Sequence, residues 1–450
     1  MGWDDVIERR EGETLSKHFV LCSFLIALTS TAGARAQDRN GLATLIPGVF
    51  GSQGLFVESE APLPGGGTHS AHFNSAFQSQ FTQFNVAFAS QLASIPLPSP
   101  ASGFTYRFDP TLGVFERTTD SFGPIFADRA ETIGKGKFTF ATLYQYISFD
   151  TIEGVGMDGI PAVFTHDDAA PGGRADVVST VNSIETSVNQ FALFGTFGLT
   201  DKVDVSLMVP IVTADMTVIS DATVQRIGTA GNPLVHFYEE DNVRVGSRRS
   251  FVVSDNASGL GDVVLRLKGA VFHADGGSGL ALGLDTRFPT GDEMDLLGSG
   301  AWGMRPFAAF SLSGKTVSPH ANIAYQWNGE SVLGGNAVTG EKGDVPDQFQ
   351  WSAGLDVAVT SRITLAGDLL GRHVSAAPRL VERTFDALDG QSTFDDIGFE
   401  DGSFTQLDGA VGIKFNIAGQ FLVDLNVLFS LNDTGLRDNA IPLLGFEYTF

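Results

Sequence analysis

The sequence is short of charge and almost free of cysteine. Its 450 residues are 18% Asp, Glu, Lys and Arg and include one cysteine, Cys22; soluble domains typically carry roughly 25% charged residues. A single cysteine excludes a disulfide framework and any cysteine-rich zinc or iron–sulfur site. The net charge of −24 argues against a nucleic-acid partner, because binding to a phosphate backbone requires clustered Lys and Arg.

Long apolar runs are also lacking. The run from Phe19 to Leu28 follows Lys17 and His18, and it is shorter than the about 20 residues that a membrane-spanning helix needs. Ala34-Arg35-Ala36 comes next and fits the small-residue pattern at which export signals are cleaved. We therefore predict that residues 1–36 are a cleaved signal peptide, and we expect no transmembrane helix in the remainder.

Glycine and phenylalanine, by contrast, are abundant. There are 53 Gly and 37 Phe, yet the mean hydropathy is only +0.09. Two classes of exported protein fit this composition, a soluble protein and an outer-membrane β-barrel, whose apolar residues alternate with polar ones. The two classes differ in their outer faces, since a lipid-facing strand side must be uncharged and a soluble sheet has a polar outer side.

Twelve segments alternate in the manner of barrel strands. In 420–431, for example, Phe421, Val423 and Leu425 occupy one side and Asp424 the other. Charged residues avoid the apolar side throughout the central parts of these segments, which favours a lipid-facing surface. Only 183–199 is unclear, because the alternation blurs around Phe191, where a β-bulge or a packed lumen would explain it. The segments are 135–150, 183–199, 203–213, 258–273, 279–290, 302–314, 318–328, 347–360, 362–374, 405–416, 420–431 and 441–450.

The connections between these segments alternate in length. Short turns, such as 200–202, are followed by long connections, including 151–182, 220–257 and 375–403. This alternation is typical of outer-membrane barrels, which have short turns at one end and long loops at the other. We therefore predict an all-β fold, a transmembrane antiparallel β-barrel of about 12 strands over residues 135–450.

The last strand ends on alternating aromatic residues. Phe446, Tyr448 and Phe450 share one side of it. This ending resembles the C-terminal signal by which outer-membrane barrels are presented to the barrel-assembly machinery. The expected location is the outer membrane, and the expected partners are outer-membrane lipid, that machinery and a small-molecule solute.

Residues 37–134 precede the barrel and are predicted to form a plug or a periplasmic segment. Six apolar residues recur there at steps of three and four, which predicts an amphipathic helix over about 72–95. Two interpretations remain open: the helix packs on the barrel wall or rim, or it plugs the lumen and contacts apolar solutes. The six residues are Phe73, Phe77, Phe81, Phe84, Phe88 and Leu92.

Several short motifs together resemble one barrel family. They include Gly259-Leu260-Gly261-Asp262, Phe288-Pro289-Thr290-Gly291-Asp292 and the stretch from His320 to Tyr325. The family is the outer-membrane family named for the meta-cleavage pathway of phenol degradation, and the likeness covers roughly 185–450. It implies a porin-like transporter that takes up aromatic compounds.

Charged residues of both signs, and one histidine, fall on the side predicted to face the lumen. One interpretation is a network of cross-strand ion pairs that fills a closed lumen. The other is a solute path, since interior residues set the selectivity of a barrel. The predicted lumen residues are Asp262, Arg266, Lys268, Asp285, Arg287, Arg305, His320, Asp356, Asp368, Arg372, Asp408, Lys414, Asp424 and Glu447.

No metal, cofactor or enzymatic activity is predicted. Histidines such as His69, His72 and His166 have no metal-site spacing, and no serine–histidine pair stands out at the lipid boundary. The predicted function is therefore a channel or transporter for small solutes, with hydrophobic or aromatic solutes favoured. The alternatives are an outer-membrane lipid hydrolase and a structural or adhesive barrel without transport.

Overall fold

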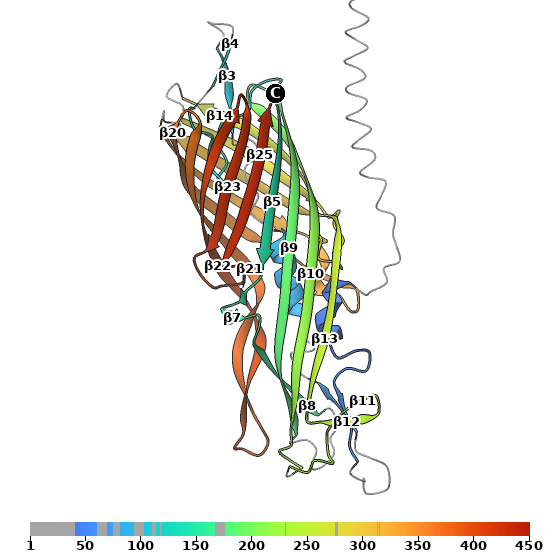
Figure 1. The fold of residues 1–450 in the computed structure, drawn as a ribbon. Coiled ribbons are helices and arrows are strands. Elements are labelled where there is room, and N and C mark those ends of the chain that lie inside the picture. The colour runs from blue at the N-terminus through green and yellow to red at the C-terminus, as the bar shows by residue number, and fades with distance from the viewer. Residues whose placement is uncertain are drawn as a thin grey trace, which may run out of the picture. The chain divides into compact units, whose positions relative to one another are not determined.

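Twelve antiparallel strands close into a ring in the computed structural model of the protein (Figure 1). The structure describes residues 41–60, 70–74, 82–93, 103–109, 114–117, 119–166, 176–229, 231–274, 278–312, 314 and 316–450. The predicted signal peptide lies outside them. Around the ring the strand order is β5-β25-β23-β22-β21-β20-β17-β16-β15-β14-β10-β9, and β9 pairs with β5. The strands are β5 (Phe138–Ser148), β9 (Val177–Thr200), β10 (Val203–Gln225), β14 (Val263–His273), β15 (Ser278–Phe288), β16 (Gly303–Leu312), β17 (Val317–Asn328), β20 (Gln348–Thr360), β21 (Ile363–Asp386), β22 (Thr393–Ala418), β23 (Phe421–Ser430) and β25 (Ala440–Thr449).

The ring confirms the predicted barrel of 12 strands. Within 183–199, β9 pairs with β10 without interruption from Ser183 to Gly198, so no bulge explains the blurred pattern. Phe191 faces outward and is 40% exposed, while Ala192 and Phe194 face inward and are buried. The inward side of this strand is therefore apolar at Ala192 and Phe194, which explains the blurred pattern there.

An apolar belt surrounds the ring. Alternate side chains point outward and remain exposed, among them Ile323 at 56% and Leu425 at 51%, while the next residues along the strands, Ala324 and Asn426, are buried inside. Exposed apolar side chains around a closed ring are not explained by contacts within the chain, and such a belt is typical of a barrel surface that faces lipid. Short turns lie at the end of the ring where the chain terminates, here called the short-turn end (Figure 1).

We expect an arginine in this belt to be strongly destabilising. Ile323→Arg should cost about 2–4 kcal/mol, because it places a charge in the hydrocarbon layer. Val252→Arg is the matched control: Val252 is 60% exposed, but it lies on β13 (Arg248–Leu260), outside the ring. Urea titrations of both variants in lipid vesicles measure the two costs. Equal costs would show that Ile323 does not face lipid.

Strands β9, β10, β21 and β22 continue beyond the ring. There the pattern of the ring reverses, because the outer side chains are polar and the inner ones apolar. In the distal part of β10, Met216 and Val218 are buried on the inner side, and Thr213, Asp215 and Thr217 lie on the outer side. A polar outer side and an apolar inner side are typical of a sheet in water. The membrane boundary on this strand therefore lies near Ile211, the last large exposed apolar residue before Thr213.

The long connections are mostly extended structure rather than loops, which corrects the sequence interpretation. The connection 220–257 contains the end of β10, strands β11 and β12, and most of β13, while 375–403 is the distal β21–β22 hairpin. The predicted segment 258–273 also divides, since Leu260 ends β13 and Val263 begins β14. The sequence criterion, an uncharged apolar side on each strand, overlooked these strands because their outer faces are polar.

The extensions of β9 and β10 belong to a sheet that also contains β1, β2, β8 and β13. Phe50 packs edge-on against Phe164 and Phe251, with ring centroids 5.2 and 5.1 Å away, and Ile46 is buried in the same core. Among the described residues, no helix is long and apolar enough to cross a membrane. The remaining elements are η1 (Leu42–Thr44), α2 (Leu45–Gly48), α4 (Thr82–Ala93), β1 (Phe56–Val57), β2 (Ala71–Asn74), β3 (Tyr106–Asp109), β4 (Val114–Arg117), β6 (Thr151–Ile152), β7 (Val155–Gly156), β8 (Ile160–His166), β11 (Tyr238–Glu240), β12 (Val243–Gly246), β18 (Glu330–Asn336), β19 (Glu341–Asp344) and β24 (Leu436–Arg437).

A buried carboxylate, Asp176, fixes the loop that follows β10. It accepts hydrogen bonds from the backbone N–H groups of Gly228 (2.7 Å) and Thr229 (3.1 Å), and it lies 2.7 Å from Nδ1 of His236. Burial would raise the pKa of Asp176, but the hydrogen bonds from His236 and Thr229 outweigh it and hold the pKa below its ordinary value. The carboxylate form therefore stabilises the fold at neutral pH.

Asp176→Asn should make this loop less stable by about 1–3 kcal/mol at neutral pH. The lowered pKa means that the stabilisation is complete above the ordinary Asp value of about 3.9 and is lost as the pH falls through the folded value. The rate of limited proteolysis in the 226–247 region measures the stability of the loop. The difference between wild type and variant should shrink on acidification, whereas a difference independent of pH would exclude this role for the charge.

Candidate functional site in the barrel lumen

Residues 119–134, here called the inner strap, lie inside the ring at its short-turn end. Apart from Asp120 they are all buried. The backbone N–H groups of Ile125, Phe126 and Ala127 donate to one carboxylate oxygen of Asp368, at 3.0, 2.6 and 3.2 Å. Side chains of the wall, rather than a strand ladder, therefore hold the strap.

Further wall residues hold the strap along its length. Ile133 N–H donates to Asp204 (3.0 Å), and the ammonium groups of Lys268 and Lys414 donate to strap carbonyls. Lys268 contacts the carbonyl oxygen of Glu131 at 2.8 Å, and Lys414 contacts that of Pro124 at 2.7 Å. Two predicted lumen residues, Lys268 and Lys414, thus face the strap, and so does Asp204, which was not among the predicted ones.

Helix α4 lies at the opposite end of the lumen. The side chain of Gln348 on β20 donates to the carbonyl and hydroxyl oxygens of Ser90, both at 3.2 Å. The carbonyl of Ala93, the last residue of the helix, accepts hydrogen bonds from Arg287 and Gln326. The helix is therefore fastened to the wall at its C-terminal end.

The helix is shorter than the sequence indicated. Phe84, Phe88 and Leu92 lie on α4, where Phe84 and Phe88 are buried and Leu92 is partly buried. Phe73 lies instead in β2, which pairs with β8, so the helix does not extend back to 72. The spacing of three and four misled here because Phe73 belongs to a short strand whose pairing partner is distant in sequence. Phe77 and Phe81 lie outside the described residues.

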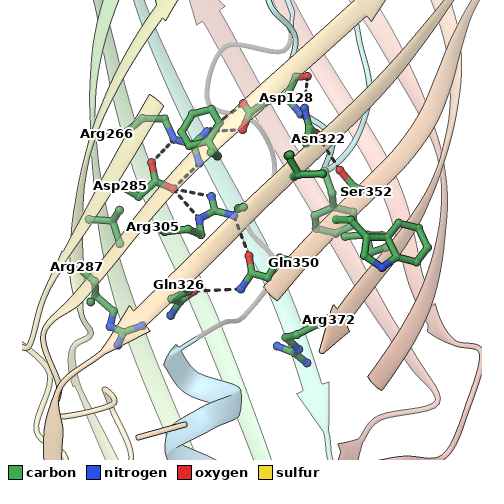
Figure 2. A pocket seen from close by; sticks show the side chains of 18 of the residues that line it. Asp128, Arg266, Asp285, Arg287, Arg305, Asn322, Gln326, Gln350, Ser352 and Arg372 are labelled. Carbon is green, nitrogen blue, oxygen red and sulfur yellow. Dashed lines mark hydrogen bonds and ion pairs between the residues drawn. The ribbon is translucent and has the colours of Figure 1, made fainter. Parts of the chain in front are cut away.

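A cavity of about 160 Å³ lies between α4 and the inner strap. Figure 2 shows its polar wall, which is built from β14, β15, β16, β17, β20 and β21. Arg266 on β14 donates to Asp285 on β15 (2.7 and 2.8 Å) and to Asp128 of the strap (3.0 and 2.9 Å). Arg305 on β16 also donates to Asp285, at 2.5 and 3.0 Å. This group, here called the cavity network, joins the strap to the wall.

Amide side chains extend the cavity network toward α4. Arg305 donates to Gln350 (3.0 Å), and Gln350 donates to Gln326 (3.1 Å). The side chain of Gln326 also reaches the last carbonyl of α4. A continuous chain of hydrogen bonds therefore connects α4 and the inner strap, here together called the inserts, across the cavity.

A second charged group lies at the α4 end of the cavity. Arg287 lies 3.6 Å from Asp262, which sits in the connection between β13 and β14 rather than in a strand. Arg372 donates to Gln91 of α4 (2.9 Å) and to Gln406 on β22. Asp408 accepts from Arg437 at 2.6 Å.

Ser311, His320 and Asp356 are hydrogen-bonded in sequence. Ser311 Oγ lies 2.9 Å from Nδ1 of His320, whose Nε2 lies 2.5 Å from Asp356. The backbone N–H of Ala130 in the strap also donates to Ser311 Oγ (2.9 Å), and Ser311 and Asp356 are fully buried. These three residue types occur together in hydrolases, but here the strap covers the serine. The trio holds the strap.

The predicted lumen residues all face inward, but they form separate groups. Twelve of the fourteen are buried, while Arg305 and Asp424 are partly buried. Asp424 accepts a hydrogen bond from Asn426 (2.5 Å), and Glu447 accepts one from the backbone of Phe104. In the described residues, no cluster of three or more His, Cys, Asp or Glu side chains could hold a metal ion.

The aromatic residues of the last strand lie on the outer surface of the ring. Phe446 stacks on Phe421, with ring centroids 6.3 Å apart, and Tyr448 contacts Phe450 edge-on at 4.6 Å. Phe450 N–H donates to the carbonyl of Phe138 (2.7 Å), which ties the chain end to the first strand of the ring.

Sequence reasoning placed residues 119–134 only within the predicted plug or periplasmic segment 37–134, and it missed the amide chain. Residues 119–134 have no periodicity, so no pattern placed Asp128 in the lumen. Gln326 and Gln350 had the inward parity, but they were not selected because only charged residues and histidine were considered. Polar residues of inward parity, charged or not, would have been the better signal.

The belt, the ring and the occupied lumen define a transmembrane β-barrel with internal segments. The profile of the family described as "Putative MetA-pathway of phenol degradation" matches residues 165–437, more than half of the chain. The chain therefore belongs to this family, as its motifs predicted. A comparison with curated proteins gave no match.

Solved barrels show low similarity to the chain. An outer membrane channel from Pseudomonas putida F1 is 13% identical, with a TM-score of 0.40, and the match covers 71% of this chain and 98% of that one. The NanC porin is 10% identical (TM-score 0.33; 61% and 98% covered). A FadL homologue from Pseudomonas aeruginosa is 10% identical (TM-score 0.30; 80% and 96% covered).

Proposed function

We propose that the protein is an outer-membrane channel for small solutes, with hydrophobic or aromatic solutes favoured. The observation that carries the proposal is the cavity between α4 and the inner strap, inside a ring whose outer belt is suited to lipid. Solutes would enter through the end of the ring opposite the short-turn end, occupy the cavity and leave at the short-turn end when the strap shifts. The name of the family is consistent with aromatic solutes.

The strap is suited to such a movement. Its backbone is bonded to wall side chains such as Asp368, Asp204 and Ser311, so it can separate from the wall without breaking a barrel strand pair. The C-terminal strand, with Phe450 at its end, is proposed to contact the barrel-assembly machinery, and the belt to contact outer-membrane lipid.

Conductance and solute efflux test the proposal. The chain from residue 37 onward, inserted in planar bilayers, should give discrete current steps, and proteoliposomes should release trapped benzyl alcohol faster than protein-free liposomes. A heat-dependent shift on gels verifies that the barrel is folded. Folded protein that gives neither current nor efflux would overturn the proposal.

A further inference from the structure

The cavity has two unlike walls. The polar wall carries Arg266, Arg305, Gln326 and Gln350, joined as described above (Figure 2). The other surfaces are apolar or aromatic, and their side chains come from the strap and from five strands. They are Phe126, Phe194, Met208, Val264, Phe307 and Leu370. A ligand that fits both walls must have an apolar body and a polar end.

The volume of the cavity suits a body of one ring. A cavity of about 150 Å³ lined by apolar residues is known to hold benzene, and this cavity has about 160 Å³. The guanidinium groups of Arg266 and Arg305 lie 4.9 and 5.8 Å from the ring centre of Phe307, so the wall already stacks cations on an aromatic ring. Phe307 fits there because its neighbour Gly283 has no side chain, since a Cβ at that position would lie 2.2 Å from the ring.

The charges around the cavity favour an anion. Among the described residues that line it and the ion-pair partners named above, there are five arginines and four aspartates, an excess of one positive charge. One monovalent anion would balance this excess. The residues counted are Arg266, Arg287, Arg305, Arg372, Arg437, Asp128, Asp262, Asp285 and Asp408.

Arg305 is placed to contact that anion. Its side chain is 29% exposed, against 11% for Arg266 and 8% for Arg287. Its three hydrogen bonds to Asp285 and Gln350 use three of its five N–H groups. The other two can donate to a carboxylate in the cavity, with charge-assisted hydrogen bonds that are about twice as strong as neutral ones.

We propose that the cavity binds a single-ring aromatic carboxylate, with the carboxylate on Arg305 and the ring against Phe126 and Phe307. This proposal rests on the proposed channel function and names the class of its solute. The excess positive charge selects against cations, and the volume selects against larger ring systems.

Binding of three probes to the folded, detergent-solubilised protein tests the proposal by calorimetry. Benzoate should bind, while benzylammonium, with the same ring and the opposite charge, and acetate, with the charge but no ring, should each bind at least about tenfold more weakly. Equal binding of benzoate and benzylammonium, or of benzoate and acetate, would overturn the proposal.

Two variants of the wall locate the site. Arg305→Gln removes the proposed donor and should weaken benzoate binding about 10- to 100-fold. Gln350→Glu keeps the side-chain shape but pairs Arg305 with a carboxylate and cancels the charge excess, so it should weaken benzoate binding to a similar extent. This second variant keeps the site testable if Arg305→Gln fails to fold. Arg383→Gln, in the exposed pair with Glu400 on the distal hairpin, is the control and should leave binding unchanged. Unchanged benzoate affinity in a folded Gln350→Glu or Arg305→Gln protein would overturn the assignment.

Efflux from proteoliposomes separates this proposal from the channel function. Benzoate binding without efflux of any solute would support the proposed binding site and refute the proposed channel function. Efflux that is equal for benzoate, benzyl alcohol and benzylammonium, with no selective binding, would retain the channel and refute the anion site.

Discussion

Asp285→Asn is expected to destabilise the barrel by about 3–5 kcal/mol, because it removes a buried carboxylate that pairs with two arginines. Asp285 is 6% exposed and accepts hydrogen bonds from both Arg266 and Arg305. Without it, Arg266 keeps only Asp128 as a partner in the cavity network. Arg305 keeps Gln350, which is neutral. The free energy of unfolding, from urea titration in lipid vesicles, measures the loss.

Glu400→Gln is the matched control for this prediction. Glu400 also pairs with an arginine, Arg383, at 2.9 Å, but the side chains are 63% and 47% exposed. Exposed pairs contribute about 0–1 kcal/mol, so this variant should unfold almost like wild type. Equal effects of the two substitutions would mean that the cavity network is hydrated as freely as the surface and is not buried.

The ring was predictable because the membrane imposes one rule on every strand. A charge facing lipid is costly, so outward positions such as Ile323 and Leu425 had to be apolar and could be identified by parity alone. The same rule placed Arg266, Asp285 and Lys414 inside. Parity gave no information on which inward residues meet, since that depends on register and on the strap.

The strand extensions beyond the ring were missed because the rule of apolar outward residues applies only within the membrane. Beyond Ile211, β10 presents Thr213 and Asp215 outward, and a test for lipid-facing residues rejects such a strand. A search for the reversed pattern, with apolar residues inside and polar residues outside, would have detected β13 and the distal half of β10.

The inserts were the hardest part to predict. The strap is neither helix nor strand, and its contacts to Asp368 and Ser311 join residues more than 180 positions apart. The spacing around Phe84 and Phe88 correctly indicated a helix. Its start was placed too early because the same spacing, by coincidence, includes Phe73.

The conductance of a strap-locked protein tests the central claim most directly. A Cβ on Gly279 would lie 3.0 Å from the Cβ of Ala130, close to the 3.5–4.5 Å that a disulfide requires. Because Cys22 lies in the predicted signal peptide, Ala130→Cys with Gly279→Cys supplies a single cysteine pair in the remainder of the chain. The disulfide would fix the strap to the wall between β14 and β16.

If solutes pass when the strap shifts, the oxidised protein should carry a current at least about tenfold smaller than the same sample after reduction. Each single-cysteine variant should conduct equally in both states, which controls for effects of the reductant. Equal currents before and after reduction, with the disulfide verified by mass spectrometry, would contradict the claim that the inner strap controls passage through this barrel.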